Sequence, residues 1–449
     1  MSTISFKDLF QPSDFADCKT VVAAVSGGGD STALLFLLRD YLARLQNPPQ
    51  LVAVTVDHRL RPESALEAEE VAKLCTTIGV VHKTVCWADA KPETALSHEA
   101  RIARYGLLFA EAEKVNASVI MTGHTLNDQA ETYEMRLHRG SHRGLACMPR
   151  ESLLMRKIRL IRPLLTIKRE ELRTYLRSIG QKWIDDPTNE NIHYERVRIR
   201  KSLKDETIDE IQKKVEEAAT FRRTQSKSAA RLINKLNITM QHALCTIHKP
   251  APELVDDPLY PFVVGVLAAI MGGAQMLASD SQTGYLKEQL MKKRQSLYRF
   301  TLLGCVIEQN DHDIRFWREA RNQTASIVAP HSSTIWDGRY RIDNLSTNPV
   351  RVATPSICDI KSVAKAEDIS TRFIHFPSLQ TALAIFTRSG IDIPALTGKL
   401  IHSEDLSCRR FMRPFGWLIS SDDYPLFDVL SPFFEILLSS LKESDQKAG

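Results

Sequence analysis

A strand, a glycine-rich turn and a helix follow one another directly near the start of the chain. The run Val21–Val25 has the composition of a buried strand, and Thr32–Leu38 that of an apolar helix. Between them stands the segment Ser26-Gly27-Gly28-Gly29-Asp30-Ser31. Glycines let a backbone approach a ligand closely, and a helix N-terminus offers unpaired N–H groups and the positive end of its dipole. This arrangement predicts a phosphate-binding turn, with Ser26 and Ser31 as hydroxyl donors.

Asp30 is the unexpected member of this turn. A carboxylate beside a phosphate repels it unless a cation lies between the two groups. The sequence therefore predicts Mg²⁺ at Asp30. The turn has no lysine, so it is not a Walker A loop, and its glycines lack the spacing of a dinucleotide-binding GxGxxG motif.

From residue 20 to 165, short β-branched runs alternate with amphipathic stretches of helical length, which is typical of βαβ units. The expected strands are Val21–Val25, Leu51–Asp57, His82–Trp87, Ser118–Thr122 and Ile158–Leu165. The expected helices are Ser31–Leu45, Ala65–Ile78, Thr94–Val115, Asp128–Arg139 and Arg169–Ile179. The pattern predicts a doubly wound α/β domain with a parallel sheet, and such sheets bind ligands at the carboxyl ends of their strands.

The chain of 449 residues is long enough for two to four domains. We expect an α/β catalytic domain over residues 1–205, followed by a mainly helical domain over 206–325. One long charged helix is expected at Asp209–Leu236, and β-like runs at Leu297–Glu308 and Ile314–Trp317. Residues 326–449 are expected to form a smaller mixed α+β domain.

Composition narrows the class of protein further. The formal net charge of +5 permits a polyanionic partner without requiring one. The eight cysteines form no CxxC pair, so reduced thiols are favoured over a structural zinc site. The N-terminus does not have the pattern of a secretory signal, and no apolar run reaches the roughly 18 residues that span a membrane. We expect a cytoplasmic protein that does not bind membranes.

The turn resembles the PP-loop of ATP pyrophosphatases, which cleave ATP between the α and β phosphates. Further segments, in their order and spacing, make the chain similar to the tRNA(Ile)-lysidine synthetases of that superfamily. These segments are Val56–Ser64, His98–Tyr105, Thr122–Thr132, Arg162–Leu165, Asp186–Asn189 and Arg196–Arg200. The resemblance implies ligation of free L-lysine to C2 of the wobble cytidine in the CAU anticodon of tRNA(Ile). ATP would first adenylate the cytidine, and AMP and pyrophosphate would be released. The modified tRNA would read AUA instead of AUG.

The resemblance also implies roles for particular residues. ATP would be bound by the turn and, near the adenosine, by Asp57 and His58, although Asp57 could also be a simple strand-end cap. Free lysine has an ε-amine pKa of about 10.4, so a carboxylate must orient or deprotonate it. The unranked candidates for this task are Asp128, Glu131 and Asp186, beside Asp30 as the metal ligand. An acid at a helix N-terminus is also favourable for dipole reasons alone, which fits Asp128 equally well.

Basic residues supply the candidates for anionic substrates, although each alone could be a solvated surface residue. Candidates for contacts to substrate or phosphate are Arg101, Arg104, His124, Arg196, Arg198 and Arg200. The last three alternate, so they could line one face of an extended segment or flank a domain boundary. Candidates for tRNA binding are Arg139, Arg143, Arg222, Arg223, Lys227 and Arg231, since phosphate neutralisation supplies much of the affinity for RNA.

The chain departs from the family pattern at three places. Asn127 stands where an aspartate is often found, the loop Arg139–Gly144 is one residue shorter and more basic, and Val197 replaces an asparagine. Two other classes stay open: a PP-loop tRNA thiolase, against which the absence of CxxC argues, and a non-catalytic nucleotide- or RNA-binding module. A glutamine-dependent synthetase would need an amidotransferase domain that the sequence does not suggest.

Overall fold

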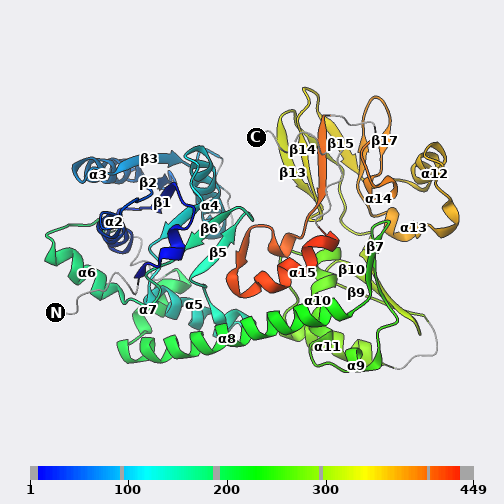
Figure 1. Ribbon diagram of the computed structural model, residues 1–449, viewed down its shortest axis with the longest axis horizontal. Coiled ribbons are helices and arrows are strands. Elements are labelled where there is room, and N and C mark those ends of the chain that lie inside the picture. The colour runs from blue at the N-terminus through cyan, green and yellow to red at the C-terminus, as the bar shows by residue number, and fades with distance from the viewer. Residues whose placement is uncertain are drawn as a thin grey trace. The chain divides into compact units, whose positions relative to one another are not determined.

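The computed structural model describes residues 9–434 apart from 90, 92–95, 186–192, 293–296 and 402–404. The chain divides into two compact units (Figure 1). The first consists of Met1–Arg223 with Leu418–Asp422, and the second of Thr224–Trp417 with Asp423–Gly449. The expected division into three domains stays a prediction.

The first unit is built on a seven-stranded sheet with the order β19-β5-β6-β4-β1-β2-β3. The strands β1, β2, β3, β4 and β6 run parallel. Next to β6, β5 pairs antiparallel, and β19 at the edge pairs antiparallel with β5. The bounds are β1 Thr20–Ala24, β2 Gln50–Asp57, β3 Val81–Cys86, β4 Val119–Thr122, β5 Glu151–Leu154, β6 Ile158–Ile161 and β19 Leu418–Ser420. The predicted α/β fold is confirmed. The strands β5 and β19, which form antiparallel pairs, were not predicted from the sequence.

Helices connect these strands and cover the sheet (Figure 1). They are α2 Gly29–Leu42, α3 Ser64–Thr77, α4 Leu96–Lys114, α5 Leu126–His138, α6 Arg169–Ser178 and α7 Glu195–Ser202. The long helix α8, Asp205–Lys235, begins in the first unit and ends in the second. All five residues of β1 are buried, and α2 is buried along most of its length, because β1 and α2 form the centre of the main core. The glycine-rich turn between them is therefore held on both sides by packed elements.

The second unit contains three antiparallel sheets. Their orders are β7-β8-β11-β10-β9, β12-β15-β16-β17 and β13-β14-β18. The strands are β7 Ile238–Gln241, β8 Leu244–His248, β9 Tyr298–Leu302, β10 Cys305–Gln309, β11 Asp313–Arg318, β12 Ser326–Val328, β13 Ser332–Trp336, β14 Tyr340–Asn344, β15 Val350–Ala353, β16 Ala384–Phe386, β17 Ile391–Asp392 and β18 Leu406–Arg410. The expected run Leu297–Glu308 is thus a hairpin, and β7 and β8 give residues 206–325 more strand than the sequence predicts.

Helices of the second unit pack beside these sheets. Their bounds are α9 Pro252–Val255, α10 Tyr260–Met271, α11 Asp280–Met291, α12 Ile357–Ala366, α13 Phe376–Leu379, α14 Pro394–Thr397 and α15 Tyr424–Phe434. Every residue of α10 is buried, which explains why its sequence is apolar on all faces. Among the helices of the described residues, none is both long and apolar enough to cross a membrane.

Candidate active site

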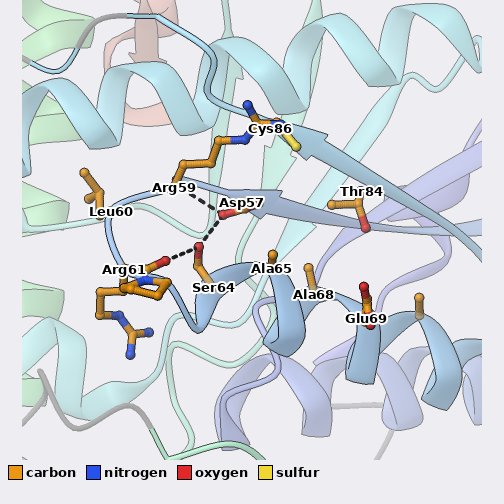
Figure 2. A pocket seen from close by; sticks show the side chains of 12 residues that line it. Asp57, Arg59, Leu60, Arg61, Ser64, Ala65, Ala68, Glu69, Thr84 and Cys86 are labelled. Atoms are coloured by element: carbon orange, nitrogen blue, oxygen red, sulfur yellow. Dashed lines mark hydrogen bonds between the residues drawn. The ribbon is translucent and has the colours of Figure 1, made fainter.

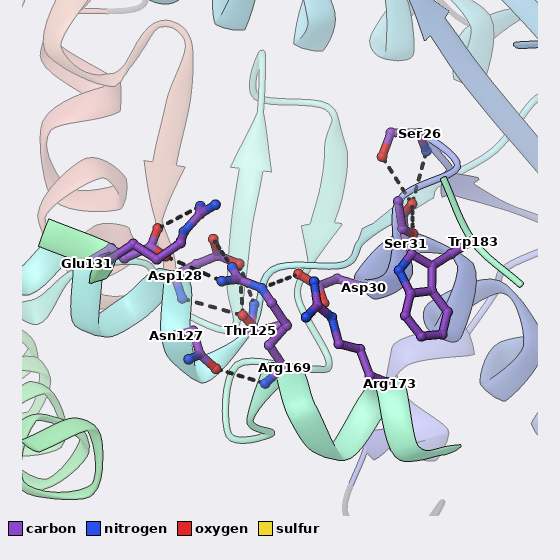
Figure 3. Close-up of polar contacts among 12 residues, drawn as sticks. Ser26, Asp30, Ser31, Thr125, Asn127, Asp128, Glu131, Arg169, Arg173 and Trp183 are labelled. Carbon is purple, nitrogen blue, oxygen red and sulfur yellow. Dashed lines mark hydrogen bonds and ion pairs between the residues drawn. The ribbon is translucent and has the colours of Figure 1, made fainter. Parts of the chain in front are cut away.

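The glycine-rich turn is closed by its own serines (Figure 3). The backbone N–H of Ser26 donates to Oγ of Ser31 at 3.1 Å, and the two hydroxyls lie 3.1 Å apart. Oγ of Ser31 also donates to the carbonyl of Gly28 at 3.0 Å. Helix α2 begins within the turn, at Gly29. Its first N–H groups therefore face the turn, which is the local structure that binds an anionic group.

Two glycines of the site are required by geometry. Gly27 has φ +85°, and a Cβ there would lie 2.6 Å from Cδ1 of Ile184. The N–H of Ile184 donates to the carbonyl of Gly27 at 2.9 Å, so the segment after α6 lies directly on the turn. Gly123 follows β4, and a Cβ there would lie 2.9 Å from the carbonyl oxygen of Asp30. The close approach at Gly123 brings the start of α5 to the turn.

Beside the turn, three carboxylates interact with three arginines (Figure 3). The carboxylates are those predicted from the sequence, namely Asp30 on α2 and Asp128 and Glu131 on α5. Arg169, the first residue of α6, contacts all three: Asp30 Oδ2 at 3.0 Å, Asp128 Oδ1 at 3.4 Å and Glu131 Oε1 at 3.5 Å. Arg196 contacts Asp128 at 2.9 Å and Glu131 at 2.6 Å, and Arg200 contacts Glu131 at 2.7 Å. We call these six residues the acid–arginine cluster.

Burial and charge determine the protonation of this cluster. Burial raises the pKa of Asp128, but Arg196 and Arg169 together outweigh it and hold the pKa at about 2. Burial raises the pKa of Asp30, and Arg169 offsets only part of that rise. Burial lowers the pKa of Arg169, yet the three carboxylates more than compensate, so its pKa lies above the ordinary range. At neutral pH, Asp128 is therefore an anion and Arg169 a cation.

Arg169 was not predicted as a site residue. A hydrogen bond between its backbone and the side chain of Asn127 holds it in the site. The side-chain oxygen of Asn127 accepts the backbone N–H of Arg169 at 2.8 Å, which satisfies an N–H group at the start of α6. Asn127 stands where an aspartate was expected from the sequence, and here it accepts the backbone N–H at the start of α6. Asp128 caps α5 in turn, because its Oδ2 accepts the N–H of Thr125 at 2.8 Å. One carboxylate oxygen of Asp128 thus accepts this N–H, while the other contacts Arg169 and Arg196.

The three alternating arginines lie on a helix, not on an extended segment. Because α7 covers Glu195–Ser202, Arg196 and Arg200 share one face and reach the cluster. Arg198 lies on another face, and its guanidinium donates to the carbonyl of His193 at 2.9 Å. The extended alternative was wrong because the spacing of four residues, not of two, brings side chains together on a helix.

Asp57 is the last residue of β2 and lines a hollow of about 740 Å³ (Figure 2), and His58 follows it in the chain. One oxygen of Asp57 accepts the N–H of Arg59 at 2.8 Å and the hydroxyl of Ser64 at 2.7 Å. Asp57 therefore acts as a cap at the strand end and also lines the hollow, together with residues of α3 and β3. The ring of His58 meets Trp87 edge to face at 6.0 Å. Burial, followed by the charges of Arg104 and Lys91, lowers the pKa of His58.

Two further predicted cations, Arg101 and Arg104, lie at Tyr105. The guanidinium groups of Arg101 and Arg104 lie 5.1 and 6.0 Å from the centre of the Tyr105 ring. His124 is buried, and its Nδ1 lies 2.8 Å from the hydroxyl of Thr122. Burial, and to a smaller extent the charges of Arg162 and Arg104, hold the pKa of His124 well below its usual range. His124 is therefore a neutral polar group at the end of β4.

The predicted tRNA-binding residues are in different environments. Arg139 pairs with Glu195 at 2.6 Å, and Arg143 is the first residue of a 3-10 turn, Arg143–Ala146. On α8, Arg222 is half-buried, whereas Arg223, Lys227 and Arg231 are exposed. Arg223 also pairs with the buried Asp422 at 3.1 Å, within the first unit. The predicted catalytic residue Asp186 lies outside the described residues.

Comparison with known proteins defines the class of the first unit. A family model described as a PP-loop domain matches residues 1–207. The tRNA(Ile)-lysidine synthase of Bartonella tribocorum is 42% identical, covering 96% of this chain and 98% of that protein. The enzyme of Bartonella henselae is 43% identical over the same shares, and that of Brucella anthropi is 36% identical over 95% and 96%. A solved U34-tRNA thiolase from Methanococcus maripaludis gives 18% identity and a TM-score of 0.42 over 47% of this chain and 76% of that chain.

The turn, the sheet and the family model define an ATP-binding PP-loop domain. The relatives described above match nearly the whole chain and not this domain alone. The chain belongs to the tRNA(Ile)-lysidine synthase family, whose members are ligases. The resemblance inferred from the motifs is confirmed.

Proposed function

We propose that this protein ligates free L-lysine to the wobble cytidine of tRNA(Ile) with the anticodon CAU. The C2 carbonyl oxygen of cytosine attacks the α-phosphorus of ATP, and pyrophosphate leaves. The ε-amine of lysine then attacks C2 and loses a proton, and AMP leaves with the former carbonyl oxygen. Lysidine, AMP and pyrophosphate are the products. The observation that carries this proposal is the acid–arginine cluster placed directly beside a phosphate-binding turn, in a chain of this family.

The turn suits the pyrophosphate part of ATP. The backbone N–H groups at the start of α2 suit phosphate oxygens. The hydroxyls of Ser26 and Ser31 bond each other and the carbonyl of Gly28 in this structure, and each would have to turn to donate to a phosphate. The hollow beside Asp57 offers room for the adenosine. The chemistry of Asp30 fits Mg²⁺, which prefers one or two carboxylates plus substrate phosphates to a cage of protein ligands. Bound there, Mg²⁺ would neutralise charge on the phosphates.

The α5 carboxylates suit the lysine nucleophile. Asp128 and Glu131 are anionic acceptors for an ammonium group, and Glu131 is 1% exposed, so water screens its charge little. Three arginines already balance the three acids, so an entering ammonium adds a fourth positive charge to the cluster. Lysine binding therefore favours release of its own proton, which is the form that attacks C2. Arg101 and Arg104 are available to the anionic groups of the substrates.

Transfer of radiolabelled lysine tests the proposal most directly. The full chain is incubated with ATP, Mg²⁺ and either tRNA(Ile) bearing CAU or the methionine tRNA bearing the same anticodon. We expect label on the isoleucine tRNA alone, with one AMP and one pyrophosphate formed for each lysine transferred. Formation of AMP and pyrophosphate without label would mean that the nucleophile is not lysine. If neither labelled tRNA nor AMP and pyrophosphate is formed, the result would favour a non-catalytic nucleotide- or RNA-binding module.

The Asp30→Asn variant tests whether the carboxylate of Asp30 is needed for the release of pyrophosphate. We expect it to remain folded, since the amide has the same shape, and to lose release of pyrophosphate by at least about 100-fold if the carboxylate holds the cation beside the phosphates. Asp40→Asn, on the same helix but at its far end, is the matched control and should keep full activity. Ligation retained by Asp30→Asn would overturn the role of Asp30.

A further inference from the structure

Arg173 on α6 follows Arg169 by one helical turn, so the two side chains lie on the same face of the helix. Arg169 contacts Asp30 from that face, and Figure 3 shows the side chain of Arg173 extending from α6 toward Asp30 as well. The charges agree with this placement. Burial raises the pKa of Asp30, Arg169 lowers it, and Arg173 lowers it further. Arg173 therefore brings a second cation to the phosphate-binding turn.

The protein itself engages this cation only weakly. Among the described residues, Arg173 makes no hydrogen bond, and its contact with the exposed Asp185 is long, at 3.8 Å. Of its three nitrogen atoms, only Nε is sealed from solvent. The side chain as a whole is 37% exposed. The terminal groups Nη1 and Nη2 are therefore the part of Arg173 that a ligand can reach.

The ring of Trp183 lies between this guanidinium and the solvent side of the turn. A Cβ atom on Gly29 would lie 3.5 Å from Cδ1 of Trp183, so the ring packs against the first residue of α2. The guanidinium carbon of Arg173 lies 5.9 Å from the centre of the same ring. Nε1 of Trp183 donates to Asp185 at 3.0 Å, which fixes the ring. Asp30 and Trp183 both adjoin the turn, so the guanidinium near them lies beside the turn.

The order of groups along the site indicates which part of ATP meets Arg173. In the proposed reaction the attack takes place at the α-phosphorus, and lysine is expected at Asp128 and Glu131. Arg169 links Asp30 to these two acids, and Arg173 lies one turn beyond it along α6. In Figure 3, Arg173 and the turn lie on the side of Asp30 away from the two acids. The terminal phosphates therefore extend from Asp30 toward Arg173.

We propose that Arg173 binds the γ-phosphate of ATP through Nη1 and Nη2, and holds the same group in pyrophosphate after cleavage. This inference rests on the proposed function, because it adds a contact to the ATP of that reaction. A guanidinium donates two parallel hydrogen bonds to phosphate oxygens, and its charge adds to the N–H groups at the start of α2. The contact with Asp185 is exposed and long, so its loss on ATP binding costs little.

Binding measured without tRNA and lysine tests this contact separately from ligation. Isothermal titration calorimetry of the full chain with Mg²⁺ compares ATP with ADP, which lacks only the γ-phosphate. In Arg173→Met we expect the Kd for ATP to rise at least about tenfold and the Kd for ADP to change less than about twofold. An unchanged Kd for ATP, or equal losses for ATP and ADP, would overturn the proposal. A protein that fails to transfer lysine would leave this comparison intact, because neither lysine nor tRNA takes part.

Arg177→Met is the matched control. Arg177 lies one turn further along α6, and its guanidinium carbon lies 5.8 Å from the centre of the Trp183 ring. It pairs with the exposed Glu170 at 2.7 Å. Both variants thus remove a cation near Trp183, but only Arg173→Met removes the one beside Asp30. We expect Arg177→Met to bind ATP as the unaltered protein does. An equal loss of ATP affinity in both variants would overturn the proposal, since both would then act through Trp183.

A second measurement covers the case in which Arg173→Met does not fold. The unaltered protein is treated with phenylglyoxal, which modifies accessible guanidinium groups, and the modified peptides are quantified by mass spectrometry. We expect ATP to protect Arg173 but not Arg177, and ADP to protect neither. Modification of Arg173 at the same rate with and without ATP would overturn the proposal.

Discussion

Arg169 connects the phosphate-binding turn to the acids of α5, and no pattern in the sequence marks it. Asp30, Asp128 and Glu131 were predicted because motifs place them after strands, at the carboxyl edge of the sheet. Arg169 comes from a separate helix, and its role follows only from its contacts with all three acids. The asparagine that anchors it, Asn127, was noted in the sequence only as a departure. The spacing of residues within a motif therefore cannot predict side chains that reach the site from distant segments of the chain.

Replacing Arg169 by methionine should destabilise the protein by about 3 kcal/mol, because three buried or partly buried carboxylates lose a shared cation. The free energy of unfolding in urea measures this loss. Arg177→Met is the matched control: Arg177 lies about two turns further along α6 and makes an exposed contact with Glu170 at 2.7 Å. Its cost should stay below about 1 kcal/mol. Equal losses in the two variants would contradict the central position of Arg169.

The depressed pKa of Asp128 predicts a loss of stability in acid. Its pKa is about 2 in the folded protein, compared with 3.8 for the ordinary group. Because the folded value is the lower one, this carboxylate stabilises the fold above about pH 4, and its contribution disappears as the pH falls from about 4 to about 2. The contribution at neutral pH is about 2 kcal/mol. Unfolding followed across this range should show a smaller pH dependence for Asp128→Asn. Glu134→Gln, on the same helix, should retain the dependence of the unaltered protein.

At the scale of elements, periodicity predicts the long segments and misses the short ones. The helices of the first unit begin and end within a few residues of the predicted positions, because each has an apolar face that the sheet buries. Strand β5, which forms a hairpin with the predicted β6, was missed because the turn between them places Met155 and Arg156 at positive φ, where a turn is normally signalled by glycine or asparagine. Helix α7 was missed because eight residues, three of them arginines, show no apolar face.

The geometry of α7 predicts different outcomes for its arginines. Arg200→Gln removes a contact to Glu131, which is 1% exposed, and should lower the free energy of unfolding by about 2 kcal/mol and lysine transfer by at least about tenfold. Arg198→Gln changes the opposite face and should cost no more than about 0.5 kcal/mol. Urea unfolding and the lysine-transfer assay compare the two variants. Similar effects in both would favour a general role of positive charge over specific contacts.

At the scale of the whole molecule, the first unit is not continuous in sequence. Leu418–Ser420 form β19, the edge strand beside β5, and Asp422 pairs there with Arg223 of α8. The catalytic domain was predicted to lie entirely within residues 1–205. A strand of three residues carries no periodicity, so its partner could not be predicted. The pairing also gives Arg223 a structural role beside its predicted role in tRNA binding.

A charge exchange separates these two roles of Arg223. Arg223→Glu places an acid beside the buried Asp422 and should lower both the unfolding temperature and the affinity for tRNA. Adding Asp422→Arg restores opposite charges and should recover the unfolding temperature. Affinity for tRNA, measured at several salt concentrations, should stay reduced if Arg223 contacts a phosphate. Full recovery of affinity in the double variant would mean that Arg223 acts on tRNA only through the fold.

The edge strand β19 also has a consequence for how the protein is made. Synthesis on the ribosome proceeds from the N-terminus, and domains generally fold as their residues emerge. Six strands of the first sheet emerge by residue 161, whereas the seventh emerges only after Leu418. Until then the antiparallel edge of β5 lacks its neighbour, and unpaired edges invite pairing with other chains. A messenger RNA cut short between the codons of Arg223 and Leu418 therefore encodes a first unit whose outer strand stays open, and such an incomplete product should aggregate.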